Sequence, residues 1–256
     1  MDVGVSMHNP FSLEGKTVLI TGASSGIGMA TSIECSKMGA KLIVVARNEE
    51  RLSECLGKLD GAGHQMVCAD LASHEDIEKL VAAVPLLDGV VNNAGIVKVL
   101  PVQFINEDDL NGIHKTNAFG AAFLSRSLYK KKKINKNGSV VFNVSISGTS
   151  VFVPGYVMYG MSKAAVHAFM KYAAVEFAGR GIRCNAVNPG MIETPLNRDD
   201  GMISAEDYEK DRLKYPLKRY GKPGEVAYAI VYLLSDASLW VTGTSLVVDG
   251  GRSLHS

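Results

Sequence analysis

Runs of apolar residues of strand length recur throughout this chain, and stretches with helical spacing separate them. The separating stretches, which include residues 27–38, 49–59, 75–84 and 108–129, are long enough for crossover helices. Because the apolar runs do not alternate with polar residues, we expect strands that are buried on both faces of a parallel sheet. The pattern predicts an α/β fold, a doubly wound parallel sheet of about seven strands with helices on both faces. The strand-like runs are TVLIT, KLIVVA, HQMVCA, DGVVNN, SVVFNVS, IRCNAVN and TSLVVD.

Length and composition favour one domain. The 256 residues fit within one large α/β sheet, and a hydrophobic share of 46% is enough for a sizeable core. We therefore predict a single domain over residues 1–256, with an N-terminal extension at residues 1–14. The least regular stretch, residues 197–220, lies between the sixth and seventh strand-like runs and is predicted to form a lid over the substrate.

Several kinds of partner and site are not expected from this sequence. Cys35, Cys55, Cys68 and Cys184 form no CxxC pair and no histidine cluster complements them, so neither a disulfide nor a metal site is predicted. The net charge of +1 gives no electrostatic reason to expect nucleic acid or a membrane surface as a partner. No apolar run has the length of a membrane span, and residues 1–15 lack the pattern of a signal peptide. We expect a cytoplasmic protein.

A glycine-rich loop follows the first strand-like run. Thr21 is followed by glycines at positions 22, 26 and 28, and a helical pattern begins at once. In such a strand–loop–helix unit, glycines allow a tight turn, a close approach of the backbone to a pyrophosphate, and close packing of helix on strand. The context predicts a Rossmann-like sheet that binds a dinucleotide through Gly22, Ser24, Ser25, Gly26, Ile27 and Gly28.

Two widely separated motifs together point to one family. The glycine spacing is G-x-x-x-G-x-G, and far downstream Tyr159 and Lys163 form a Y-x-x-x-K motif. This combination resembles the short-chain dehydrogenase/reductase family, and the C-terminal half is most similar to its 3-oxoacyl-[acyl-carrier-protein] reductases. The resemblance extends from Leu13 to Gly251, and its further motifs are Asn92-Asn93-Ala94-Gly95, Asn117, Ser145, Pro189-Gly190 and Asp249-Gly250-Gly251.

Tyr159 and Lys163 lie four residues apart, so a helix places them on one face. A phenol titrates near pH ~10, and a neighbouring ammonium would stabilise its phenolate, which brings proton transfer nearer to neutrality. The resemblance implies that Tyr159 is the general acid in reduction and the general base in oxidation, and that Lys163 also hydrogen-bonds the nicotinamide ribose. It further implies that Ser145 holds the substrate oxygen. Asn117 would kink its helix and connect Lys163 to solvent through a bound water.

Two serines are candidates for the residue that binds the substrate oxygen. The segment NVSISG, residues 143–148, lacks the adjacent serines that are usual in the family. Ser145 is selected when residues are counted forward from the start of the strand. The Ser-x-x-Gly spacing to Gly148 also selects Ser145. Counting back from Tyr159 places the serine one residue later, which implies a one-residue insertion between residues 149 and 157. Ser145 is preferred, and Ser147 is the alternative.

Residues after other strand-like runs resemble the family's cofactor contacts. They are Asp70 and Leu71 after the third run, Asn93, Ala94 and Gly95 after the fourth, and Pro189, Gly190, Ile192 and Thr194 after the sixth. For Asp70, the alternative is a cap on the helix that follows.

The end of the second run bears on the choice of cofactor. Enzymes that use NAD usually have an acid at this place, whereas this chain has Ala46-Arg47. A guanidinium can pair with a 2′-phosphate, so NADP(H) is predicted, with NAD(H) as the alternative. Arg47 as a solvated loop residue is the competing interpretation.

The sequence therefore predicts an NADP(H)-dependent oxidoreductase that reduces a small-molecule carbonyl to an alcohol. A 3-oxoacyl-[acyl-carrier-protein] reductase of fatty acid biosynthesis is the first candidate. The alternatives are a sugar or polyol dehydrogenase of the gluconate type and, in another class, a catalytically silent dinucleotide-binding regulator. The resemblance also implies a homotetramer. The helix after Lys163 is apolar around much of its circumference, with Val166, Phe169, Met170, Ala173 and Phe177 on one stripe, so it is expected to pack both on the sheet and on a partner helix. The resemblance further implies an acidic acyl carrier protein that docks beside the active-site mouth on residues 130–133, Lys136 and Arg180. Lysines at a helix end also complement the helix dipole without any partner.

Overall fold

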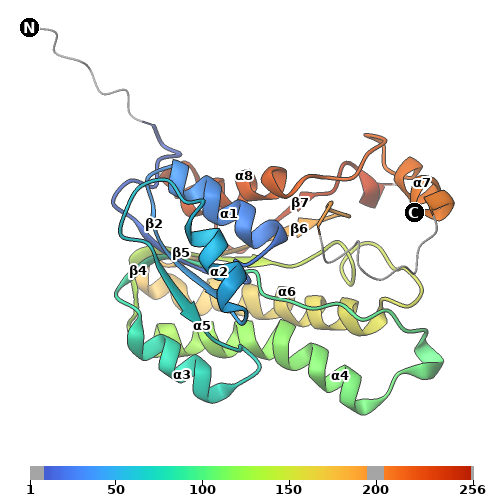
Figure 1. Cartoon of the computed structure of the whole chain (residues 1–256), viewed down its shortest axis with the longest axis horizontal. Helices are drawn as coiled ribbons and strands as arrows, with labels where there is room; N and C mark the ends of the chain where they lie inside the picture. The colour runs from blue at the N-terminus through green and yellow to red at the C-terminus, as the bar shows by residue number, and fades with distance from the viewer. Residues whose placement is uncertain (1–8, 195–204, 255–256) are drawn as a thin grey trace, which may run out of the picture.

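A parallel sheet of seven strands organises the molecule (Figure 1). The structure, a computed structural model, describes residues 9–194 and 205–254. Within these residues the strand order is β3-β2-β1-β4-β5-β6-β7, and every neighbouring pair is parallel. The predicted doubly wound α/β fold is thereby confirmed. The strands are β1 (Thr17–Thr21), β2 (Lys41–Ala46), β3 (Gln65–Cys68), β4 (Leu87–Asn92), β5 (Ile134–Asn143), β6 (Arg183–Pro189) and β7 (Ser245–Val248).

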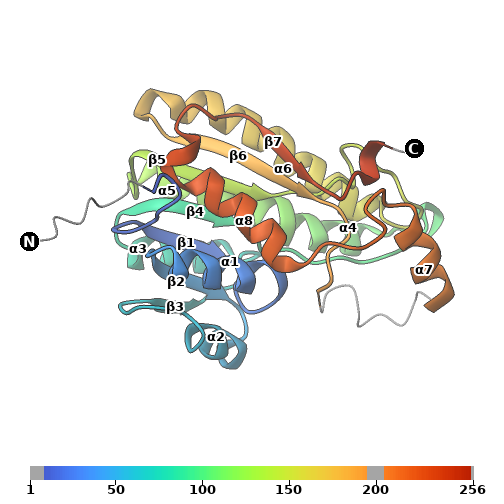
Figure 2. The same ribbon diagram turned by 90° about the horizontal axis from the view of Figure 1, so that it is seen from above.

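Helices cover both faces of the sheet (Figures 1 and 2). They are α1 (Gly26–Lys37), α2 (Glu49–Leu56), α3 (His74–Ala83), α4 (Glu107–His114), α5 (Gly120–Lys130), α6 (Val157–Phe177), α7 (Ala205–Leu213) and α8 (Pro223–Leu234). Val18 and Ile20 of β1 pack in the core formed with α1, α2 and α8. Leu19, between them, packs in the core formed with α3, α5 and α6. Both faces of β1 are buried, which explains its unbroken apolar sequence.

The helix predicted over residues 108–129 is divided in the structure. A π-helical turn, Lys115–Phe119, joins α4 to α5. Asn117 lies in this turn, where its side chain accepts a hydrogen bond from Ile96 N–H (2.8 Å) and donates to the Ile96 carbonyl (2.9 Å) and the Ser162 hydroxyl (3.0 Å). The wider turn fits a helix that must direct one polar side chain into the protein. Asn117 therefore connects three segments that are distant in sequence.

The strand order reverses between β1 and β4. The chain moves outward from β1 through β2 to β3, then crosses over and moves outward again from β4 to β7. In open α/β sheets, the crevice beyond the carboxyl ends of the strands at such a reversal is where ligands bind. The glycine loop follows β1 and the Asn92-Asn93-Ala94-Gly95 motif ends β4, so both lie at this crevice.

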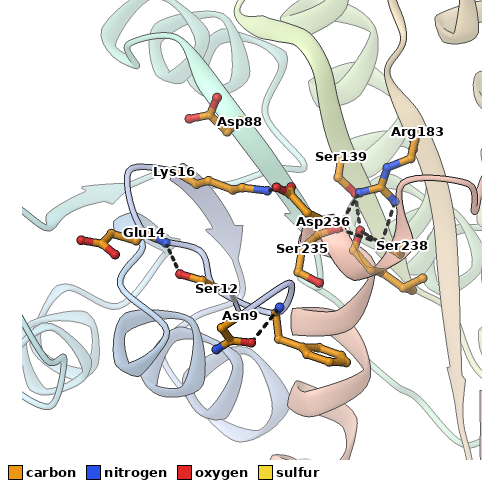
Figure 3. A network of polar contacts seen from close by, with 12 residues as sticks. Asn9, Ser12, Glu14, Lys16, Asp88, Ser139, Arg183, Ser235, Asp236 and Ser238 are labelled. Carbon is orange, nitrogen blue, oxygen red and sulfur yellow. Dashed lines mark hydrogen bonds and ion pairs between the residues drawn. The ribbon is translucent and has the colours of Figure 1, made fainter. Parts of the chain in front are cut away.

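A polar network ties segments together at the amino end of β6 (Figure 3). Arg183, at the start of β6, donates to the Ser238 hydroxyl (2.9 Å) and the Ser235 carbonyl (3.3 Å). Lys16, just before β1, forms an ion pair with Asp236 in the turn after α8. These contacts join β6, α8 and the segment before β1 at the end of the sheet opposite to the crevice.

Parts of two predicted segments lie outside the described residues. They are residues 1–8 of the extension predicted at residues 1–14 and residues 197–204 of the lid predicted at residues 197–220. Leu13 of the extension is fully buried, and its N–H donates to the Met38 carbonyl (2.8 Å). In the lid segment, the described part begins with α7. None of the described helices is both long and apolar enough to cross a membrane.

Candidate active site

A cavity of about 840 Å³ opens beyond the carboxyl ends of the strands. It brings together most of the predicted site residues. Gly28 and Asn117 are buried and do not line it. The predicted residues in its wall are Gly22, Ser24, Ser25, Gly26, Ile27, Arg47, Asp70, Leu71, Asn93, Ala94, Gly95, Ser145, Tyr159, Lys163, Pro189, Gly190, Ile192 and Thr194, together with the alternative serine, Ser147.

The glycine loop leaves β1 through backbone conformations that favour glycine. Gly22 and Gly26 have φ angles of +64° and +52°. At Gly28 a Cβ would lie 2.1 Å from the Gly22 carbonyl oxygen, so only glycine lets α1 begin this close to the end of β1. Gly26 and Ile27, in the first turn of α1, line the cavity and offer unpaired backbone N–H groups to an anion. The loop therefore fits the pyrophosphate of a dinucleotide.

Asn93 holds the glycine loop in place. Its side-chain amide donates to the carbonyl oxygens of Thr21 (3.1 Å) and Gly22 (3.2 Å). Its side-chain oxygen accepts a hydrogen bond from the Asn143 amide at the end of β5 (2.8 Å). Asn93 thus connects the carboxyl ends of β1, β4 and β5, besides lining the cavity.

Ser145, Tyr159 and Lys163 meet in the cavity wall. The Lys163 Nζ lies 5.6 Å from the centroid of the Tyr159 ring, one turn away on α6. It donates to the Asn143 carbonyl (2.8 Å), and only 4% of Lys163 is exposed. The Ser145 hydroxyl, which arrives from the loop after β5, forms a hydrogen bond with the Tyr159 side chain. One helix and one strand end therefore position the three groups.

Burial controls the protonation of Tyr159 and Lys163. Burial raises the pKa of Tyr159 to about 12, although the hydrogen bond with Ser145 acts in the opposite direction. Burial also lowers the pKa of Lys163 to about 8. The Y-x-x-x-K spacing predicts that the ammonium lowers the tyrosine pKa toward neutrality, but the loss of water disfavours both charged forms and raises this pKa instead. At neutral pH Tyr159 keeps its proton.

The loop between β5 and α6 brings Ser145, rather than Ser147, to Tyr159. The Ser147 N–H donates to the Ser145 hydroxyl (3.0 Å), and the Ser147 side chain packs against Gly160 of α6. Gly148 follows with a φ of +82°, and a Cβ there would lie 2.1 Å from the Gly160 carbonyl oxygen. The close contact between Gly148 and α6 therefore determines how near the serine loop comes to Tyr159.

The structure assigns the helix cap after β3 to a residue other than Asp70. Ser73 is the N-cap of α3, and its hydroxyl accepts a hydrogen bond from the Asp76 N–H (3.2 Å). Asp70 lines the cavity, with one carboxylate oxygen bonded to the Ala72 N–H (2.9 Å). The alternative interpretation of Asp70 as that cap is therefore wrong.

The basic residues considered for carrier docking lie at the other end of the sheet. Residues 131–133 precede β5, whereas the cavity is reached at Asn143, where β5 ends. Ile134 pairs with Leu87 and Phe142 with Asn92, so five residue steps of β4, at about 3.3 Å each, separate the two ends by roughly 16 Å. Lys131 pairs with Glu78 (2.6 Å), and Arg180 donates to the Ile134 carbonyl (2.6 Å). Within one chain, the prediction that this cluster lies beside the active-site mouth is wrong.

Several cavity residues were missed by the sequence argument. Asn143 ends β5 and is the first residue of segment 143–148, a position that could have indicated it. Arg51 also lines the cavity, and its position four residues after Arg47 could have indicated it from the sequence. No motif indicated Lys210, Asp211, Lys214 or Tyr215, which lie in the segment predicted as a lid, or Arg252. Among the described residues, no three histidine, cysteine, aspartate or glutamate side chains are grouped so that they could hold a metal ion.

Known proteins resemble this chain over nearly its whole length. The family profile described as enoyl-(acyl carrier protein) reductase matches residues 22–253. A glucose 1-dehydrogenase from Gluconobacter oxydans is 36% identical over 249 residues, which are 94% of this chain and 93% of that protein. The 3-oxoacyl-[acyl-carrier-protein] reductase FabG from Thermotoga maritima is 37% identical over 246 residues, or 93% and 98% of the two chains.

Solved structures show the same likeness. A short-chain type dehydrogenase/reductase from Mycobacterium marinum superposes with a TM-score of 0.83 and 31% identity, covering 95% of this chain and 97% of that chain. A structure from Sinorhizobium meliloti gives a TM-score of 0.90 at 30% identity, with 97% and 100% covered. Sequence, fold and cavity agree, and the chain belongs to the short-chain dehydrogenase/reductase family of oxidoreductases, which bind a nicotinamide dinucleotide and act on small molecules.

Proposed function

We propose that this protein is an NADP(H)-dependent carbonyl reductase in which Tyr159 donates the proton. The observation that carries the proposal is the meeting of Ser145, Tyr159 and Lys163 in the wall of the cavity that the glycine loop also lines. A regulator that only bound a dinucleotide would have no use for these three polar groups at one point. The same wall also includes Arg47, so one cavity contains both the predicted cofactor contacts and the predicted catalytic groups.

In this proposal the neutral Tyr159 hydroxyl gives its proton to the carbonyl oxygen as the alcohol forms. The Ser145 hydroxyl holds that oxygen, and the Lys163 ammonium returns a proton to Tyr159. The bound nicotinamide supplies the hydride in reduction and accepts it in oxidation. A Cβ on Gly95 would lie 3.3 Å from the Asn117 side-chain oxygen and 3.5 Å from the Lys163 Nζ. Both groups face the same space, where a bound water can connect Lys163 to solvent.

The rate of reduction should fall as the pH rises through about 8, the pKa to which burial lowers Lys163. Lys163 can return a proton only as the ammonium, whereas Tyr159 keeps its proton over this range. We expect kcat/KM to fall about tenfold per pH unit in the alkaline limb. The pH profile of NADPH oxidation with a diketone measures this. Lys163→Arg, whose guanidinium stays charged but cannot release a proton, should lower kcat at every pH, and a parent profile that is flat up to about pH 10 would contradict the relay.

Arg47 leads us to expect a preference for NADPH over NADH. A charge-assisted contact with the 2′-phosphate contributes on the order of 1.5–3 kcal/mol, so Arg47→Ala should raise the KM for NADPH roughly ten- to a hundredfold. The KM for NADH should change little. Arg126→Ala, at an exposed position on α5, is the matched control. Initial rates at varied cofactor concentration give these values, and equal efficiency with both cofactors in the parent enzyme is the contrary outcome.

A 3-oxoacyl thioester is the first candidate substrate and a sugar is the second. The FabG relative supports the first, and the glucose 1-dehydrogenase relative supports the second. A panel of thioesters, diketones and sugars, followed through the absorbance of NADPH, tests the proposed function. Turnover of sugars alone selects the second class. Binding of NADPH without turnover of any compound selects the silent regulator. If a carrier protein presents the thioester, the structure favours docking away from residues 130–133.

We also propose a cytoplasmic homotetramer. One apolar stripe on α6 faces the core, since Val166, Met170, Ala173 and Phe177 are buried. A second apolar stripe on α6 is exposed, with Met161, Ala165, Ala168, Tyr172 and Val175. Trp240, near β7, is 100% exposed and provides a separate apolar surface. A tetramer with dihedral symmetry needs two different interfaces, and these two surfaces can supply them. Light scattering at micromolar concentration distinguishes it from a monomer.

A further inference from the structure

We propose that the active-site cavity contains a subsite for an anionic group of the substrate, formed by Lys214 and Arg252 with Lys210 beside them. The proposal rests on the proposed reductase function and narrows its substrate to carbonyl compounds that carry an anion, such as oxo acids. These three cations line one part of the cavity wall, and Asp211 is the acid in the same part. Three cations and one acid therefore line this part of the wall, whereas Asp249, whose charge also acts on the Tyr215 hydroxyl, is buried and does not line the cavity.

Tyr215 places this part of the wall beyond the ends of β6 and β7. Its hydroxyl accepts a hydrogen bond from the Met191 N–H (3.0 Å), and a Cβ on Gly190 would lie 3.2 Å from its ring. Lys214 precedes Tyr215, and the charge of Arg252 acts on the Tyr215 hydroxyl. Figures 1 and 2 both place α7 and the C-terminal turn beyond the carboxyl ends of these strands.

The cofactor's phosphates are expected on one side of the catalytic residues, and the three cations lie on the other side. The glycine loop follows β1 and Arg47 follows β2, whereas β6 and β7 are the third and fourth strands from β1 in the other direction. At about 4.8 Å between strands, this is a separation of roughly 14–19 Å. Ser145 follows β5, which lies between the two groups. Thr194 reaches back from the end of β6 to Gly26 of the glycine loop, whereas Lys214, beside Tyr215, and Arg252, after β7, belong to the wall near the ends of β6 and β7, which we assign to the substrate.

The two lysines keep only weak attachments to acids of the protein. Lys214 pairs with Asp211 (3.2 Å), whose other oxygen accepts a hydrogen bond from the Tyr220 hydroxyl (2.9 Å). Lys210 pairs with Glu206 (2.8 Å). Both lysine side chains are more than half exposed, at 57% and 64%, and such surface pairs contribute about 0–1 kcal/mol. A ligand carboxylate can replace these contacts and gain charge-assisted hydrogen bonds.

The test compares oxo acids of increasing chain length with their methyl esters, from 4-oxopentanoate to 6-oxoheptanoate. At one length the acid should exceed its ester by about tenfold or more in kcat/KM, and added salt should reduce this preference. Lys214→Gln and Arg252→Gln should each lower the acid-to-ester ratio several-fold. Lys37→Gln is the matched control, because Lys37 forms a pair with Glu34 at the same i,i+3 spacing as Lys214 with Asp211, but at the end of α1.

Three outcomes separate this subsite from the proposed function. Esters reduced as efficiently as acids at every length would overturn the subsite and leave the reductase function standing. In the second outcome, Lys214→Gln and Arg252→Gln raise the KM for NADPH equally with the acid and with the ester. This result would show that the cations bind the cofactor, and it would also overturn the subsite. If no ketone is reduced, the proposed reductase function is wrong. Titration calorimetry of the protein with the same oxo acids then tests the subsite by itself. Binding weakened by Lys214→Gln supports it, and absence of binding overturns it.

Discussion

Replacing Tyr159 by phenylalanine should lower kcat for carbonyl reduction by a factor of about 10² to 10⁴, while the Kd for NADPH stays nearly unchanged. The substitution removes the hydroxyl that holds the transferable proton and its hydrogen bond with Ser145, but it keeps the aromatic ring. Because burial raises the pKa of Tyr159 to about 12, the hydroxyl is protonated at neutral pH and ready to donate. Steady-state oxidation of NADPH gives kcat, and the quenching of NADPH fluorescence gives Kd.

A pair of serine variants provides the control for this prediction. Ser145→Ala removes the hydroxyl that contacts Tyr159, whereas Ser147→Ala removes one that packs against Gly160. The first should lower kcat far more than the second. The reverse order would show that the serine loop is placed one residue out of register. A Tyr159→Phe enzyme with nearly the parent kcat would exclude Tyr159 as the proton donor.

Gly148→Ala should lower both stability and activity. Its φ of +82° is unfavourable for alanine, and the new Cβ would lie 2.1 Å from the Gly160 carbonyl oxygen. Strain and overpacking together should cost about 2–4 kcal/mol of unfolding free energy, which corresponds to a fall in Tm of roughly 5–15 °C. The loop must also move away from α6, which separates Ser145 from Tyr159. We expect kcat to fall about a hundredfold even in the fraction that remains folded.

Gly112→Ala on α4 is the matched control for this substitution. A Cβ at Gly112 would meet no atom within 4 Å, and its φ needs no glycine. Alanine should therefore stabilise this helix by about 0.5–1 kcal/mol and leave kcat unchanged. Thermal melts and initial rates measure both effects. If Gly148→Ala is as stable and active as the parent enzyme, the close contact between the serine loop and α6 has no role in positioning the site.

Strand positions were predictable because both faces of the parallel sheet are buried. TVLIT coincides with β1 and KLIVVA with β2, since a strand covered on both sides needs an unbroken apolar sequence. The division of the helix predicted at residues 108–129 was not visible in its periodicity. The π-helical turn at Asn117 satisfies hydrogen bonds to Ile96 and Ser162, which belong to other elements.

The sequence by itself determined the features that depend on local spacing. These are the glycine loop after β1, the one-turn separation of Tyr159 and Lys163, and the presence of Arg47 at the end of β2. Each needs only a strand, a turn or a helix, whose geometry is set by neighbouring residues. The family resemblance rests on the order of these same local motifs.

Only the tertiary structure decided which distant groups share a site and how they are charged. It brought Ser145 to Tyr159, placed the basic residues before β5 at the wrong end of the sheet for the cavity, and brought Lys214 and Arg252 into one wall. It also reversed the expected direction of the tyrosine pKa, because burial of Tyr159 outweighs its hydrogen bond with Ser145. The physical reason is common to these cases. Burial and contact between distant segments depend on how the helices pack on the sheet, which the spacing of residues within one segment does not encode.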